Sequence, residues 1–342
     1  MDAEHSRPLE ELRGDDEPRF GGKSTSLGEL MASGVPVPPG FALATTAFEA
    51  FLEEAALTDR IARDLSKLDS EDLEAVRTAS TAVMEVMRAA PIPETVRAEI
   101  ADRYDEDSPV AVRSSALGED SAEATFAGQQ ETYLWVRGAE RVCEAVRDCW
   151  ASLYSPEAMS YRARMPAATP AMGVTVQSMV DASVSGVMFT CNPVSGDPST
   201  VAVNASWGLG LAVVGGEVTP DEYRVNKVTR DVLSKTIGPK QVEYLPDPGG
   251  GGTVRADVPP ERQEAACLGD EQLEALVDVA LRVERHFGSH QDIEWAIARD
   301  GSLYILQSRP VTAPPKKSDP PRPRSAIALV MGTFGAGDDA GS

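Results

Sequence analysis

The sequence QDIEWAIARDGSLYILQSRP, residues 291–310, predicts a β-hairpin. Its apolar residues favour two short strands, Ile293–Ala298 and Ser302–Gln307. Between them Arg299-Asp300-Gly301 contains an Asp-Gly pair, which is a strong signal for a tight hairpin turn. The two strands are therefore expected to run antiparallel to each other.

The polar residues of this hairpin form a candidate metal site. Side chains alternate along a strand, so Asp292 and Glu294 project to the same face, and Gln307 on the partner strand is placed to face them. Two carboxylates and an amide oxygen suit a magnesium ion that bridges nucleotide phosphates. Arg309 is available to balance the phosphate charge. The alternative is a pair of solvated acidic positions on an edge strand.

A second candidate position is Arg113, at the end of the predicted strand Val110–Ser115. An arginine where a strand meets a loop can bind phosphate oxygens with its forked guanidinium. The loop that follows, 118–128, is rich in Gly, Ala and Ser and is small enough to fold over a phosphate chain. The alternative is that Arg113 pairs with Glu119 or Asp120 and orders this loop.

The segment GGKSTSLGEL, residues 21–30, predicts a glycine turn that leads into a helix. The GxxxxGK[ST] spacing of a Walker A loop is absent, so that assignment fails. Lys23 near a helix start can still add a point charge beside backbone N–H groups that meet a phosphate. Otherwise Lys23 is a solvated cation in a turn.

A strand end at Gln177-Ser178-Met179-Val180 is a weaker candidate for an adenine contact. Such an end can offer backbone groups to the edge of a base and a methionine to its face. A methionine at a strand end is more often part of the core.

The rest of the chain predicts an α+β fold with antiparallel strands. Residues up to Phe20 are expected to be an irregular lead-in, and the proline-rich segment 35–43 an extended edge segment. Apolar spacing predicts helices over 46–90, 137–161 and 270–287, and strands over 131–136, 173–179, 186–190, 199–205, 221–226 and 232–236.

Composition limits the classes of function. The net charge of −22 argues against nucleic acid or an anionic membrane surface as a general partner. No run approaches the roughly 18–20 apolar residues of a membrane span, and the acidic start of the sequence is unlike a secretory signal, so a cytoplasmic location is expected. Cysteines 143, 149, 191 and 267 show no metal-ligand spacing and are expected to be small buried hydrophobes.

Several segments occur in the order found in one known family. They are Gly21–Leu30, Val112–Ala116, Phe126–Thr132, Gly186–Pro193, Gln291–Ala296 and Gln307–Pro310. In this order they resemble the N-terminal nucleotide-binding domain of the pyruvate phosphate dikinase and phosphoenolpyruvate synthase group. Rifampin phosphotransferase and the subunits of phenylphosphate synthase belong to the same group.

The resemblance implies an ATP-grasp fold, in which two main subdomains enclose a nucleotide cleft, with ATP and Mg²⁺ as cofactors. It implies that Lys23 and Arg113 hold the phosphates, that Gly128 and Thr132 lie in the covering loop, and that Gln177, Met179 and Val180 line the adenine pocket. It also implies that Glu294 and Gln307 coordinate magnesium with support from Asp292, and that Arg309 contacts the phosphates.

Four regions follow from this reading. We expect a lead-in over residues 1–20, a first ATP-grasp region over 21–190, a second region with the magnesium site over 191–312, and a Pro-rich linker or disordered tail over 313–342. One departure stands out, because the family commonly has an acidic residue in a GLGE stretch. This chain has Gly208-Leu209-Gly210-Leu211, and Leu211 offers no polar contact there.

The resemblance implies a mechanism that needs a second component. In this family a histidine on a swivelling domain takes phosphate from ATP, with release of AMP, and carries it to an acceptor such as a phenol or pyruvate. None of His5, His286 and His290 lies in the Gly/Thr/Ser-rich turn of that domain. We therefore expect a dikinase-type phosphotransferase that needs a partner subunit or domain. The alternatives are an ATP-grasp ligase that releases ADP, and a regulatory protein that binds ATP without turnover.

Overall fold

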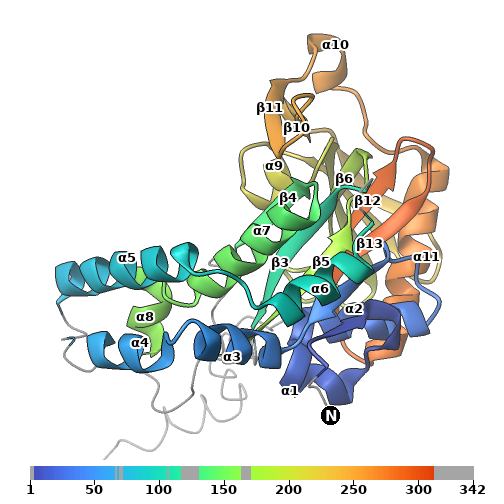
Figure 1. Ribbon diagram of the computed structural model, residues 1–342. Helices are drawn as coiled ribbons and strands as arrows, with labels where there is room; N and C mark the ends of the chain where they lie inside the picture. Colours follow the sequence, from blue (N-terminus) through green and yellow to red (C-terminus); the bar gives the residue numbers. More distant parts are fainter. Residues whose placement is uncertain are drawn as a thin grey trace, which may run out of the picture. The chain divides into compact units, whose positions relative to one another are not determined.

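The computed structural model describes residues 4–65, 68, 72–105, 108–116, 131–162 and 171–311. Residues 1–311 form one compact unit, which contains every helix and strand described below. The unit is built on two larger antiparallel sheets with helices beside them, so the α+β prediction is confirmed (Figure 1).

The first sheet has five strands in the order β1-β2-β5-β3-β4. The strands are β1 (Ser6–Pro8), β2 (Gly40–Leu43), β5 (Met172–Ser178), β3 (Val110–Ala116) and β4 (Thr132–Val136). The helices that follow these strands in the chain are α3 (Thr45–Glu54), α4 (Thr58–Leu65), α5 (Leu73–Ala89), α6 (Glu94–Arg103), α7 (Ala139–Ser152) and α8 (Pro156–Arg162). Their shared core is centred on Trp150, whose ring stacks on Phe51 at 5.2 Å.

The second sheet has six strands in the order β13-β12-β6-β7-β8-β9. The strands are β6 (Ala182–Phe189), β7 (Thr200–Trp207), β8 (Asp221–Asn226), β9 (Val232–Thr236), β12 (Gln291–Ala298) and β13 (Leu303–Pro310). The helix α11 (Asp270–Phe287) packs its apolar side on this sheet, around the fully buried Trp295. Both bounds of α11 and of the β8–β9 hairpin agree with the sequence prediction.

The N-terminal residues are more regular than predicted. They contain β1, the 3-10 helices η1 (Leu9–Glu11) and η2 (Gly14–Asp16), and α1 (Glu17–Phe20). Leu9, Leu12 and Phe20 are completely buried in the core of the second sheet, together with residues of α2 (Gly22–Ala32). The expectation of an irregular lead-in is therefore wrong. Tertiary packing orders these few apolar residues, and the many charged residues around them give no regular apolar pattern in the sequence.

Two further expectations need correction, and some elements were not predicted. The segment 35–43 does not form a sheet edge: β2 begins after Pro39 and pairs with β1 on one side and β5 on the other. The helix expected over 137–161 is divided between α7 and α8. A second hairpin, β10 (Val242–Pro246) with β11 (Thr253–Asp257), was not predicted, because its strands are only five residues long and are separated by a glycine-rich segment that is typical of a loop. The short helices α9 (Leu211–Val214) and α10 (Pro260–Gln263) were also not predicted.

All four cysteines are free and buried, as predicted. Burial raises the pKa of the Cys143 thiol to about 11, which leaves it protonated at neutral pH. Among the described residues, no helix combines the length and apolar character needed to cross a membrane.

Candidate functional site

The β12–β13 hairpin brings its polar residues together as the sequence predicts. Glu294 and Gln307 are directly opposed across the two strands, and Asp292 is opposed to Arg309 two residues along. Because this spacing is two residues on both strands, the two pairs share one face of the hairpin. The ladder register shifts immediately after Glu294, so the polar pairs lie on one side of this irregularity.

Arg113 reaches the Glu294–Gln307 pair from the other sheet. Its Nη2 donates to Glu294 Oε2 at 3.1 Å and also to Gln307 Oε1, while its Nη1 donates to the backbone oxygen of Leu306 at 3.0 Å. The Arg113 side chain is 12% exposed. A cation from β3 therefore joins β12 and β13, and the alternative pairing of Arg113 with Glu119 or Asp120 falls outside the described residues.

The oxygen atoms at this point fit a divalent cation. A carboxylate oxygen of Glu294 and the amide oxygen of Gln307 converge on a single positively charged nitrogen of Arg113. Both oxygens therefore favour a positive charge at the position of that nitrogen. Carboxylate and amide oxygens are also the hard donors that Mg²⁺ prefers, and the pair leaves further coordination positions for phosphate or water.

Lys23 is held near Arg113 by a hydrogen bond to the backbone of the next residue, Ser114. Its Nζ donates to the backbone oxygen of Ser114 at 3.0 Å, and the residue is 6% exposed. Gly21 makes this approach possible: its φ is +79°, and a Cβ there would lie 2.1 Å from the backbone oxygen of Ser115. The glycine turn therefore holds the start of α2 against β3, and the alternative of a solvated lysine is excluded.

Asp292 and Arg309 form the second pair of the hairpin. Arg309 Nη2 lies 2.9 Å from Asp292 Oδ2, and the Asp292 side chain is 14% exposed. Burial raises the pKa of the Asp292 carboxyl, and the Arg309 guanidinium opposes that shift in part. The pair keeps a carboxylate and a guanidinium next to the Glu294–Gln307 oxygens.

The residues predicted for adenine fall into two environments. Met179 and Val180 belong to a small apolar cluster at the ends of both sheets, which also holds Trp135, Leu209 and Leu306. Gln177 is instead 2% exposed within β5, where its Nε2 lies 3.4 Å from the backbone oxygen of Pro38. The structure thus joins Met179 and Val180 in one apolar cluster and holds Gln177 apart by its own hydrogen bond.

Leu306 is a site residue that the sequence prediction missed. Its backbone oxygen accepts from Arg113, and its side chain packs with the cluster that contains Met179 and Val180. It therefore links the polar pair to the apolar cluster. A contact made by a backbone oxygen does not depend on residue type, so the sequence pattern could not identify Leu306. Its position next to Gln307 on the strand was the one available indication.

Thr132 and Gly128 were predicted to lie in the loop that covers the phosphates, and the structure describes only Thr132. Thr132 is exposed at the start of β4 and is the strand partner of Arg113. Gly128 lies outside the described residues. Leu211 begins α9 and lines a cavity of about 490 Å³ with Thr132, Trp135 and Gly251.

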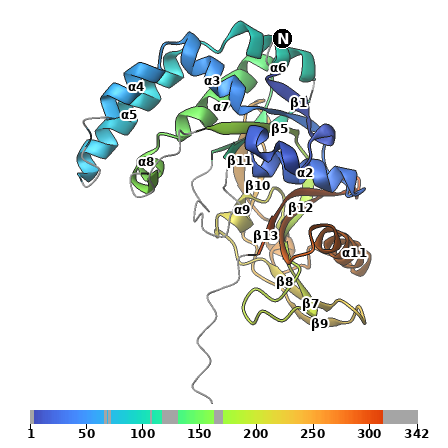
Figure 2. The same cartoon turned by 90° about the horizontal axis from the view of Figure 1, so that it is seen from below.

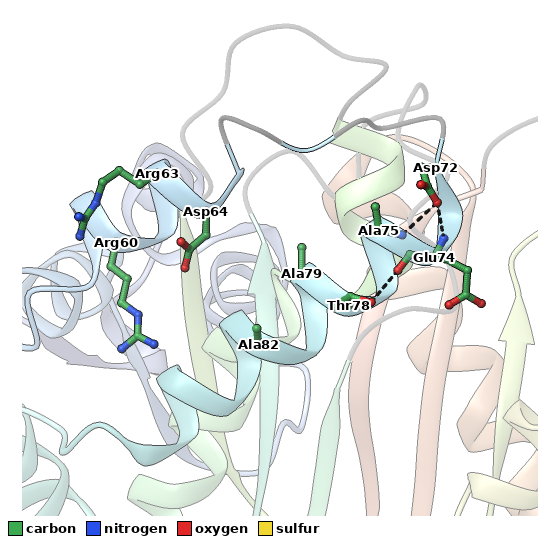
Figure 3. Close-up of a pocket in the computed structure, with 9 residues that line it drawn as sticks. All are labelled: Arg60, Arg63, Asp64, Asp72, Glu74, Ala75, Thr78, Ala79 and Ala82. Atoms are coloured by element: carbon green, nitrogen blue, oxygen red, sulfur yellow. Dashed lines mark hydrogen bonds between the residues drawn. The ribbon is translucent and has the colours of Figure 1, made fainter.

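A separate cavity of about 850 Å³ lies between α4 and α5. Figure 3 shows its lining residues, among them Arg60, Arg63, Asp72 and Glu74. The carboxylate of Asp72 caps α5 by accepting from the backbone N–H groups of Glu74 and Ala75. Among the described residues, none of the predicted site residues lines this cavity.

Arg113 of β3 thus meets oxygen donors of β12 and β13, and the Lys23 ammonium lies at the backbone of the next residue of β3, Ser114. Sites that hold an anionic ligand together with a divalent metal ion combine cations and oxygen donors in this way. The family described as "Pyruvate phosphate dikinase, AMP/ATP-binding domain" matches residues 17–326. The chain belongs to this family. All the predicted site residues fall inside the matched range.

Curated relatives of this chain include phosphotransferases. It is 40% identical over 334 residues to a probable phosphoenolpyruvate synthase of Methanothermobacter thermautotrophicus, covering 95% of this chain and 48% of the relative. It is 43% identical over 298 residues to a rifampicin phosphotransferase of a Streptomyces species, covering 85% of this chain and 34% of the relative. The chain therefore spans less than half the length of these relatives.

The solved structures that match are more distant. The ADP complex of N5-carboxyaminoimidazole ribonucleotide synthetase aligns at 12% identity and a TM-score of 0.29, covering 70% of this chain and 45% of that chain. A likeness this low carries no argument, so the ATP-grasp assignment rests on membership of the family.

Proposed function

We propose that this chain binds ATP with Mg²⁺ and presents it to a histidine carried by another domain or subunit, with release of AMP. The observation that supports this most directly is the convergence of Arg113 with Glu294 and Gln307, because it joins a phosphate-binding cation to a metal-binding oxygen pair. The bound magnesium ion supplies charge neutralisation on the phosphate chain.

The residues of the chain have distinct tasks in this proposal. Lys23, Arg113 and Arg309 hold the phosphate oxygens, and their charges stabilise the negative charge of the transferring group by position. Glu294 and Gln307 hold the metal, and Asp292 orients Arg309. Met179 and Val180 contact the adenine ring from the apolar cluster, in which Leu306 places that ring next to the phosphate-binding residues.

The histidines of the chain support an acceptor that lies elsewhere. His5 is buried beside Thr46, His286 lies 3.1 Å from Glu29, and His290 lies 2.6 Å from Glu284. None belongs to α2, β3, β12 or β13. We therefore assign to the partner both the phosphorylated histidine and the binding site for the final acceptor, such as a phenol or pyruvate.

The test is the identity of the nucleotide product. The chain is incubated with ATP, Mg²⁺ and the protein encoded next to it, and nucleotides are separated by chromatography. We expect AMP and an acid-labile phosphate on the partner. ADP as the product would favour a ligase of the same fold, and tight binding of ATP with neither product would favour a regulatory function.

A further inference from the structure

The cation that holds the two sheets together occupies the metal position of the proposed site. Arg113 Nη2 is the atom on which Glu294 Oε2 and Gln307 Oε1 converge. Nη1 is fixed at the same time by the backbone oxygen of Leu306. We propose that Arg113 is a place-holder for the metal ion: it fills the Glu294–Gln307 pair until nucleotide arrives, so that metal ion and nucleotide enter together.

The first argument is electrostatic. The guanidinium and a divalent ion carry charges of the same sign, and Arg113 approaches both oxygens within hydrogen-bonding distance. A metal ion cannot lie between the same two oxygens while Nη2 remains there, because the space is occupied and the two positive charges repel each other. Removal of Arg113 from this position is therefore a condition for metal binding.

The second argument concerns the donor that Arg113 leaves unused. Its Nε is buried and has no hydrogen-bond partner in the part of the chain that the structure describes, although a guanidinium carries five N–H donors. A buried donor without an acceptor costs free energy, so the present position of Arg113 is incompletely satisfied. A phosphate group offers acceptors in the forked arrangement that a guanidinium matches, and so gives Arg113 a better-satisfied alternative.

The third argument is the position of Arg113 between the sheets. It stands on β3 of the five-stranded sheet, whereas its three partners stand on β12 and β13 of the six-stranded sheet. Transfer of the guanidinium from Glu294 and Gln307 to a phosphate therefore exchanges a direct contact between the sheets for one made through nucleotide and metal ion. The place-holder thus makes binding of metal ion conditional on binding of nucleotide.

The inference rests on the proposed function in one respect, namely that Glu294 and Gln307 hold the metal ion. Its test is binding of Mn²⁺ without nucleotide, followed by electron paramagnetic resonance, because Mn²⁺ takes the same oxygen ligands as Mg²⁺. The wild-type chain should bind weakly. Arg113→Met should bind at least ~10-fold more tightly, since a competing charge-assisted contact is removed.

Arg299→Met is the matched control, because it removes the same charge from the turn of the β12–β13 hairpin, where Arg299 pairs with Asp181, and leaves Arg113 on Glu294. It should change Mn²⁺ affinity by less than about threefold, as expected for a general charge effect. Adding Glu294→Gln to Arg113→Met should return the affinity to the wild-type value. Equal gains in the Arg113→Met and Arg299→Met variants, or no gain in either, would overturn the proposal.

Two further measurements keep the result interpretable. If Arg113→Met does not fold, Arg113→Lys carries the test, because a single ammonium cannot hold both oxygens and the Leu306 carbonyl together and should still raise Mn²⁺ affinity. Calorimetry of Mg-ATP binding to the wild-type chain tests the proposed function itself. Tight Mg-ATP binding with no gain of Mn²⁺ binding would overturn only the place-holder, whereas no Mg-ATP binding would overturn the function.

Discussion

Two residues of the candidate site carry positive charge in different surroundings. Arg113 is neutralised by Glu294 and further held by an amide and a carbonyl oxygen. Lys23 is almost fully buried, and its Nζ donates to the backbone oxygen of Ser114. Both cations are therefore positioned by β3, Arg113 as a member of that strand and Lys23 through the backbone of Ser114.

Replacing Lys23 with Met should weaken ATP binding. The variant keeps the apolar stem of the side chain and loses a charge-assisted contact to phosphate, for which we expect a ~10-fold to 100-fold loss of affinity. The melting temperature without ligand is measured beside it, so that loss of the buried hydrogen bond to Ser114 is separated from loss of phosphate binding. Calorimetry and thermal melting measure the two effects. Lys235→Met, at an exposed position on β9, is the control and should bind ATP normally.

Glu294→Gln should remove the contribution of magnesium to ATP binding. The amide keeps the shape of the side chain but loses the negative charge that a divalent cation requires. We expect Mg²⁺ to improve ATP affinity of this variant by roughly 10-fold less than in the wild type. ATP titrations with Mg²⁺ and with EDTA give this comparison. Glu222→Gln, at an exposed position on β8, should keep the full magnesium effect, and a similar loss there would argue against a specific metal ligand.

At the scale of elements, the sequence predicts what local patterns determine. The β12–β13 hairpin follows from two apolar runs around an Asp-Gly turn, and Gly301 there has the left-handed φ of 89° that such a turn requires. This pattern placed Glu294 opposite Gln307 in advance. The β10–β11 hairpin was missed, because its strands are only five residues long and carry few apolar residues. Its pairing depends on a turn that residue type alone describes poorly.

The start of β8 also takes part in an ion pair that the sequence did not predict. Asp221 and Lys240 are both completely buried, and their side chains form a salt bridge. Asp221 also accepts from the backbone N–H groups of Gly238 and Cys267. The carboxylate therefore connects the start of β8 with two later loop segments.

Lys240→Met should strongly destabilise the protein. The substitution leaves the Asp221 carboxylate buried without its cation, and loss of one member of a buried pair costs about 3–5 kcal/mol. Urea unfolding followed by circular dichroism measures the change in the free energy of unfolding. Lys235→Met serves again for comparison: it removes an exposed cation over the Tyr223 ring and should cost no more than ~1 kcal/mol. Equal effects of both substitutions would mean that the buried pair has no special weight.

At the scale of the whole compact unit, long-range pairing decides what the sequence leaves open. β6 follows β5 directly in the chain, yet β5 belongs to the five-stranded sheet and β6 pairs with β12 and β7 of the other sheet. Figure 2 shows α2 beside β13, and Ser26 on α2 donates to the backbone oxygen of Ser308 at 2.9 Å, although the two residues are 282 positions apart in the chain. Such contacts depend on the complete core, so local patterns near residue 190 do not show that β6 joins the six-stranded sheet.

This organisation makes the position of a truncation decisive. A chain that ends after Val311 retains all of β13 and the hydrogen bond from the Val311 N–H to the backbone oxygen of His290. It should therefore melt at the wild-type temperature and bind ATP with wild-type affinity. A chain that ends after Tyr304 loses the buried Ile305 together with Gln307 and Arg309, and should not fold cooperatively. Thermal melting and calorimetry compare the two chains. Normal folding of the longer chain with loss of ATP binding would show that residues 312–326, which the family match includes, contribute to the site.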